Sequence, residues 1–261
     1  MGGPMSTPPT AAPFRPASEV LTLRHGLSWM MLACASGAVN AGAFLACDRF
    51  VTHVTGTLTL SGIDARAWVL MVDYLLVVLA FIAGAMGSVF VVQARSRRGL
   101  AQRPWLALVV VSAALAAAAV GGHFGLFGPI GGRVEESADF ELLCILAFAM
   151  GLQNATVATS TALSVRTTHM TGPASDLGVH LGTAWLSEGE ERRLALRLAA
   201  LRGSTLVAFT VGAGVMVPAM KLGGHLALLG PAVLISVAGL RSLATLPGLL
   251  SLAALVRSSG R

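Results

Sequence analysis

The chain has 261 residues, of which 55% are apolar and only 11% charged, and its mean hydropathy is +0.76. Because soluble domains carry about 25% charged residues, this composition excludes a soluble globular protein. The net charge of +6 fits basic loops at a membrane surface, and no cluster of basic residues interleaved with aromatics indicates nucleic-acid binding. The apolar residues fall in blocks of about 20, the length of a membrane-spanning helix. This predicts an all-α polytopic membrane protein that has the lipid bilayer as its partner, and not a β-barrel.

Six apolar spans are predicted along the chain, and charged or Gly- and Pro-rich stretches separate them. They cover about 26–47, 68–92, 105–122, 142–163, 203–219 and 224–240. A Pro-rich tail without an apolar centre precedes the first span, so it is typical of disorder and lacks the pattern of a signal peptide. Residues 241–256 stay apolar but contain an Arg and a Pro, which leaves open a short seventh span or an interfacial helix.

The charges predict the orientation. The loop 93–104 holds four arginines, and placing it in the cytoplasm also places both termini and the charged run 188–202 there. We therefore expect a multi-pass protein of the inner (plasma) membrane with both ends cytoplasmic. The expected domains are a disordered cytoplasmic tail (1–25), a three-helix repeat (26–122) and an acidic external loop (123–141). A second three-helix repeat (142–245) and an interfacial tail (246–261) follow.

One pair of motifs occurs twice. Gly37-Ala38-Val39-Asn40-Ala41 precedes Thr52-His53-Val54-Thr55-Gly56, and Gly151-Leu152-Gln153-Asn154-Ala155 precedes Thr168-His169-Met170-Thr171-Gly172. Each copy therefore places an Asn inside an apolar run and a Thr-His-x-Thr-Gly break after it. Self-similarity of this kind indicates an internal duplication.

A third repeated segment, called here the Phe landmark, supports the duplication. Phe81-Ile82-Ala83-Gly84-Ala85 and Phe209-Thr210-Val211-Gly212-Ala213 share Phe, Gly and Ala at the same positions. Three spans separate corresponding points. Because three is odd, the two halves are expected to point in opposite directions across the bilayer. Inverted repeats with interrupted helices near the midplane are typical of secondary transporters.

The breaks predict a polar site. In hydrocarbon an interruption of a helix survives only when it is buried in protein or lines a polar cavity. If a short helix begins after each Gly, its free N–H groups and positive dipole end favour an anion. The candidate substrate-binding residues are Asn40, Thr52, His53, Thr55, Gly56, Gln153, Asn154, Thr168, His169, Thr171 and Gly172.

A purely structural interpretation of these residues stays open beside the functional one. The two Asn side chains would then bond across helices, the Thr residues would cap helix starts, and the His residues would lie at headgroup level. Asp176 and His180 are candidates for a proton relay with His169. The spacing of the His residues is not diagnostic of a metal, and three cysteines at no recurrent spacing indicate neither a zinc site nor disulfides.

No enzyme motif is present, so we expect no catalytic residues, no cofactor, no metal and no enzymatic activity. The leading functional hypothesis is a secondary transporter or permease for a small solute or ion, with an anion or a proton-coupled solute as the class. The alternative is a non-transporting membrane scaffold or sensor that binds a lipid or protein partner. The oligomeric state is left open.

The segments GAVNAGAFL…VTHVTGTLTLSG and FAMGLQNATVATSTALSVRTTHMTG resemble the YoaK-like family of bacterial inner-membrane proteins. The resemblance covers about residues 26–245, and its more specific part is the second copy. It implies about six spans and no established activity. The first copy departs from the family pattern, in which Asp is common at the position of Asn40 and Asn often occupies the position of Thr57.

Overall fold

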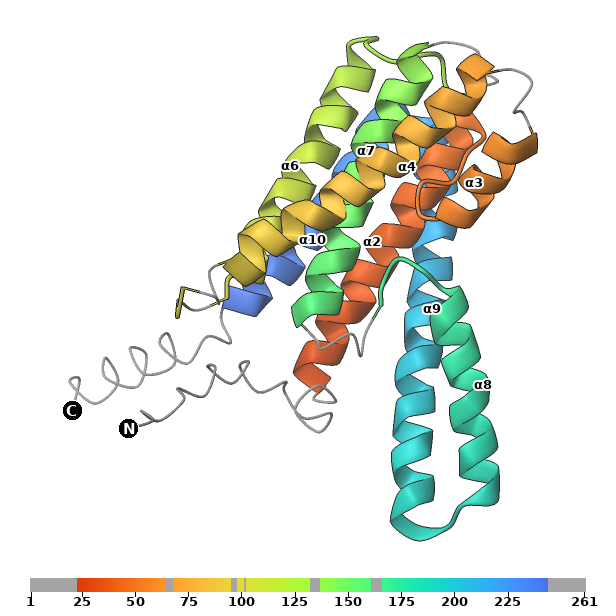
Figure 1. Cartoon of the computed structure of the whole chain (residues 1–261), viewed down its shortest axis with the longest axis vertical. Helices are drawn as coiled ribbons and strands as arrows, with labels where there is room; N and C mark the ends of the chain where they lie inside the picture. The colour runs from red at the N-terminus through yellow and green to blue at the C-terminus, as the bar shows by residue number, and fades with distance from the viewer. Residues whose placement is uncertain are drawn as a thin grey trace, which may run out of the picture.

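The computed structural model describes residues 23–63, 68–94, 98–100, 102–131, 137–160 and 166–243. All regular secondary structure in these ranges is helical (Figure 1). The predicted tail 1–25 and the apolar stretch 241–256 lie almost wholly outside the described residues. The fold class is therefore the predicted one, an all-α polytopic membrane protein.

The first four spans agree closely with the apolar runs of the sequence. They are formed by α2 (Leu23–Cys47), α4 (Trp68–Ser88), α6 (Pro104–His123) and α7 (Ser137–Ser160), and α4 continues into the π-helical turn η1 (Val89–Gln93). By length and composition, five helical segments of the described chain are able to cross a membrane. The fifth, Gly189–Arg241, covers the last two predicted spans together.

The last two spans follow each other without a long loop. α9 (Gly189–Gly223) is joined through the 3-10 turn η2 (Gly224–Leu228) to α10 (Leu229–Leu243). Gly224 adopts a φ of 56°, a left-handed conformation that glycine adopts freely, and this lets the chain turn back. The 15 residues of α10 and the five of η2 together rise about 32 Å, enough to cross a hydrocarbon core.

The charged run 188–202 is expected from the sequence to be a loop, and this prediction is wrong. From Gly189 onward these residues form the first turns of α9, a continuous helix of 35 residues. Glu, Arg, Leu and Ala dominate the run, and all four are strong helix formers, so propensity overrides the expectation of a loop. Residues 171–186 likewise form a helix, α8 (Thr171–Leu186), which packs against α9. Figure 1 shows that α8 and the start of α9 project beyond one end of the bundle.

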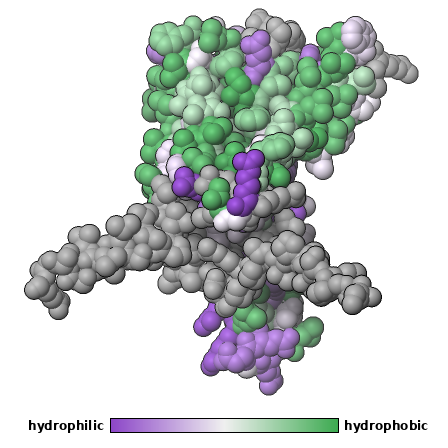
Figure 2. Space-filling model, turned by 60° about the vertical axis from the view of Figure 1, so that its left-hand side comes forward, coloured by the Kyte–Doolittle hydropathy of each residue, from purple (hydrophilic) through white to green (hydrophobic). Residues whose placement is uncertain are grey.

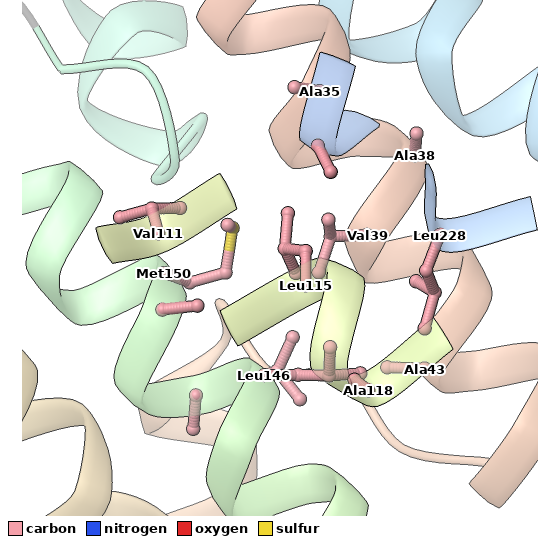
Figure 3. Packing of buried hydrophobic residues seen from close by; sticks show 14 of the residues in the cluster. Ala35, Ala38, Val39, Ala43, Val111, Leu115, Ala118, Leu146, Met150 and Leu228 are labelled. Carbon is pink, nitrogen blue, oxygen red and sulfur yellow. The ribbon is translucent and has the colours of Figure 1, made fainter. Parts of the chain in front are cut away.

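The bundle core is built from small and branched side chains of four elements. α2, α6, α7 and η2 contribute most of the residues that meet in Figure 3, where Val39, Leu115, Leu146 and Met150 point toward one another. Alanines at fully buried positions let these helices approach closely, the packing that is common between membrane helices.

Corresponding glycines of the two halves make corresponding contacts. A Cβ on Gly151 would overlap the main-chain carbonyl of Phe81, and a Cβ on Gly37 would overlap that of Phe209. In the same way Gly84 lies against the carbonyl of Phe148, and Gly212 against that of Cys34. The packing of α4 along α7 therefore matches the packing of α9 along α2. In each pair, the helix that carries the Phe landmark of one half contacts the helix that carries the Asn of the other half.

Candidate functional site

The first helix break is held by Asn40. α2 ends where Asp48 adopts a φ of 51°, and the chain then turns back before α3 (Val54–Ile63) begins. The carboxamide oxygen of Asn40 accepts hydrogen bonds from the main-chain N–H of Thr52 at 3.1 Å and from its hydroxyl at 3.0 Å. Asn40 Nδ2 lies 3.4 Å from Nδ1 of His53. One buried Asn thus fixes both the backbone and the imidazole at the start of α3.

The second break repeats this arrangement. The carboxamide oxygen of Asn154, on α7, accepts a hydrogen bond of 2.7 Å from the hydroxyl of Thr168. Thr168 is buried and His169 is half-buried, and α8 begins two residues later, with Pro173 in its first turn. Proline suits this position because the first N–H groups of a helix have no intrahelical partner. The two motif copies therefore form the same Asn–Thr hydrogen bond in front of a new helix.

The second break lies near the middle of the bundle. The ring of His169 contacts that of Phe81, with 5.6 Å between centroids. Phe81 lies 13 residues from the start and 11 from the end of the span Trp68–Val92, which places His169 near mid-depth. His53 and Arg166 both lie within electrostatic range of His169. In Figure 1 the connection into α3 descends from one end of the bundle, and the connection into α8 rises from the other.

Gln153 joins the second break to the other half of the molecule. Its side chain is fully buried, and the two protons of Nε2 are shared among three acceptors, namely the carbonyl of Leu32 at 3.1 Å, Ser36 Oγ at 2.8 Å and Thr167 Oγ1 at 3.4 Å. Its Oε1 atom is buried and has no hydrogen-bond partner among the residues that the structure describes. A buried acceptor without a hydrogen bond destabilises the folded protein by about 1–3 kcal/mol. Oε1 of Gln153 is therefore an acceptor that a ligand beside the second break could use.

The remaining predicted residues lie at the exposed starts of the two short helices. Thr55 and Gly56 are exposed in the first turn of α3, as are Thr171 and Gly172 in that of α8. A Cβ on Gly172 would meet nothing within 4 Å, and one on Gly56 would meet only the Cβ of His53, at 3.8 Å. Both helix starts are therefore open, and their free N–H groups are accessible to a ligand.

Sequence reasoning missed two residues of this site, Ser36 and Thr167, which hold Gln153. The sequence could have indicated Thr167, because its hydroxyl directly precedes the repeated motif. Ser36 lies on α2, more than a hundred residues away in the chain, and only packing brings it near Gln153. Asp176, considered for a proton relay, forms an ion pair with Arg202 at 3.2 Å. Within the described ranges no group of three His, Cys, Asp or Glu residues is placed to hold a metal.

Comparison with known proteins gives one family. The family described as "Protein of unknown function (DUF1275)" matches residues 28–240, which covers both breaks and nearly all residues of the spans described above. Neither a curated protein nor a solved structure matches the chain significantly.

Proposed function

Because the chain belongs to the DUF1275 family, which includes the YoaK-like proteins and whose description assigns no activity, we propose its function from the geometry of its two breaks: a secondary transporter or permease for a small solute. A single observation carries the proposal. His53 and His169 each lie beside an Asn–Thr hydrogen bond at the start of a short helix, and His169 lies near mid-depth against Phe81.

The paired contacts of the two halves support an alternating mechanism. If the halves are an inverted repeat, exchanging their conformations opens the site to one side of the membrane and then to the other. The matched packing of Gly151 on Phe81 and of Gly37 on Phe209 supports such an exchange, because both halves use the same close contact. We accordingly propose transport and no enzymatic step.

The chemistry of the breaks favours a small anion or a solute that moves with a proton. Two helix starts offer free N–H groups and positive dipole ends, which stabilise negative charge. His53 and His169 add imidazoles, the side chain that most often relays protons in proteins. The first copy has Asn40 and no carboxylate, so proton coupling through an acidic residue at that position is not part of the proposal.

We also propose that the protein lies in an inner membrane with both termini in the cytoplasm. The arginines of α9 and of the stretch after α4 then lie on the cytoplasmic side, in agreement with the positive-inside rule. The hairpin of α8 and α9 then projects into the cytoplasm.

Flux through purified protein in proteoliposomes tests the function. Vesicles containing a pH-sensitive dye receive inward gradients of chloride, phosphate or acetate, and both solute uptake and internal pH are recorded. We expect wild-type protein to conduct one of these probes. Asn154→Ala and His169→Ala lose the flux while remaining folded at the assay temperature, and Leu79→Ala, a change on the exposed face of α4, retains it.

Absence of flux for all three probes with wild-type protein would contradict the proposed solute class. Equal flux in wild type, Asn154→Ala and His169→Ala would contradict the proposed route. Either result would favour the alternative of a scaffold or sensor that does not transport.

A further inference from the structure

The second helix break contains a buried hydrogen-bond acceptor that the protein itself does not use. Gln153 is 0% exposed, and no donor among the described residues reaches its Oε1 atom. The carboxamide cannot be turned around, because Nε2 faces the main-chain carbonyl of Leu32 at 3.1 Å and a carbonyl oxygen only accepts hydrogen bonds. The orientation of Gln153 is therefore fixed, and Oε1 is a permanent acceptor beside the break.

The contacts of Nε2 indicate from which side a ligand reaches this carboxamide. Its two protons suffice for the Leu32 carbonyl and for Ser36 Oγ at 2.8 Å, and both residues belong to α2. Ser36 donates its own proton to the same carbonyl at 2.9 Å, which leaves its oxygen free to accept. The third contact, to Thr167 in the break, is the longest at 3.4 Å. The break can therefore move away from Gln153 without leaving a proton of Nε2 unpaired.

The charges around the second break favour an anion. The N-terminus of α8 directs free N–H groups and a positive dipole end toward the break. Arg166 lies within electrostatic range of His169. Asp176, the one carboxylate of α8, forms an ion pair with Arg202 at 3.2 Å, so its charge is balanced. A ligand at this break therefore meets positive groups together with one buried acceptor.

On the premise of the proposed function, we propose that the solute of this site is a singly charged oxyanion that carries a hydrogen, such as bicarbonate or dihydrogen phosphate. Its negative charge faces the start of α8, and its O–H group donates to Oε1 of Gln153. Nitrate or chloride has the same charge but no hydrogen, so it leaves the buried acceptor unpaired. A site built to pair with a donor of its substrate rejects an analogue that lacks this donor. Gln153 is thus the residue that determines specificity.

The first break lacks this means of selection. Val39 stands beside Asn40 at the position that Gln153 occupies beside Asn154, and a valine side chain offers no acceptor. The carboxamide oxygen of Asn40 already accepts two hydrogen bonds from Thr52. The selection for a hydrogen-bearing anion therefore lies in the second half of the molecule.

Bicarbonate and nitrate form a matched pair of probes, because both are planar, singly charged anions and only bicarbonate carries a hydrogen. Binding is measured as the shift of the thermal unfolding midpoint of the purified full chain in detergent, titrated with each sodium salt at one pH and one ionic strength. We expect wild-type protein to bind bicarbonate roughly tenfold or more tightly than nitrate. Gln153→Met loses this preference. Thr156→Val, which changes another buried polar residue of α7 outside the site, keeps it.

Equal binding of bicarbonate and nitrate by wild-type protein, or no saturable shift with bicarbonate, overturns the proposal, and neither result needs a variant to fold. A preference that survives in Gln153→Met overturns it as well. Acetamide, an uncharged N–H donor, should not shift the midpoint, and saturable binding of acetamide would contradict an anion as the ligand. Because the assay does not require transport, a preference for bicarbonate without flux in proteoliposomes contradicts the proposed function alone. Equal flux of nitrate and bicarbonate contradicts only the specificity.

Discussion

Gly151 lies directly against the main-chain carbonyl of Phe81, with no room for a Cβ between the two helices. The contact holds the Asn-bearing helix of one half against the Phe landmark of the other, and Gly37 and Phe209 make the same contact on the other side of the bundle. Because His169 contacts the ring of Phe81, this close approach also sets the position of the second break.

Gly151→Ala should therefore destabilise the protein by about 1–3 kcal/mol, the usual effect of overpacking a tight contact. Gly37→Ala should act in the same direction. The matched control is Gly214→Ala, because a Cβ added at Gly214 in α9 would meet nothing within 4 Å, so this position should tolerate the change. Thermal unfolding in detergent measures the three variants, and an equal midpoint for all of them would contradict the tight contact.

The hydrogen bond between Asn154 and Thr168 should stabilise the folded protein, and the two side chains should act together. Thr168→Val and Asn154→Ala each remove the 2.7 Å bond, and a hydrogen bond between membrane helices is worth about 0.6–2 kcal/mol. In a double-mutant cycle the combined variant should be less destabilised than the sum of the two single variants. Thr168→Ser keeps the hydroxyl and serves as the control. Strict additivity would show that the two side chains do not interact.

Gln153 should tolerate an apolar replacement of similar length better than a charged one. Gln153→Met removes the hydrogen bonds that Nε2 donates, but it also removes Oε1, which has no partner in the described part of the chain, so the two effects partly offset each other. Gln153→Glu places a carboxyl group in a fully buried position beside the carbonyl of Leu32, where a negative charge has no partner. We expect normal yield of folded protein for Gln153→Met and a severe loss for Gln153→Glu. Equal yields would indicate that water reaches this position.

The spans and the two breaks are predictable because both follow from local composition. Charged or Gly-rich stretches border the runs 26–47 and 68–92, and the described spans have the same bounds. The repeated Asn and Thr-His-x-Thr-Gly pattern correctly indicates where α3 and α8 begin. In both cases the energy of transferring residues into hydrocarbon dominates, and it depends on the sequence alone.

Other features are not predictable because they depend on packing between distant segments. Nothing local connects Ser36 with Gln153, or Gly212 with the carbonyl of Cys34. The helical start of α9 escapes prediction for a different reason, since its charge suggests a loop although the run 189–202 is rich in helix-forming residues. Charge predicts contact with water, but it does not predict the absence of a helix.

The most direct test of the central claim is whether water reaches the starts of α3 and α8. Thr55→Cys and Thr171→Cys are made separately and treated, in sealed vesicles of known orientation, with membrane-impermeant thiol reagents that attack the thiolate. Leu79→Cys, at a position 57% exposed in the middle of α4, provides the lipid-facing control. The account predicts that both Thr positions react far faster than the control, each from at least one side of the membrane. Reaction of Thr55→Cys and Thr171→Cys no faster than Leu79→Cys would contradict a polar route through the bundle.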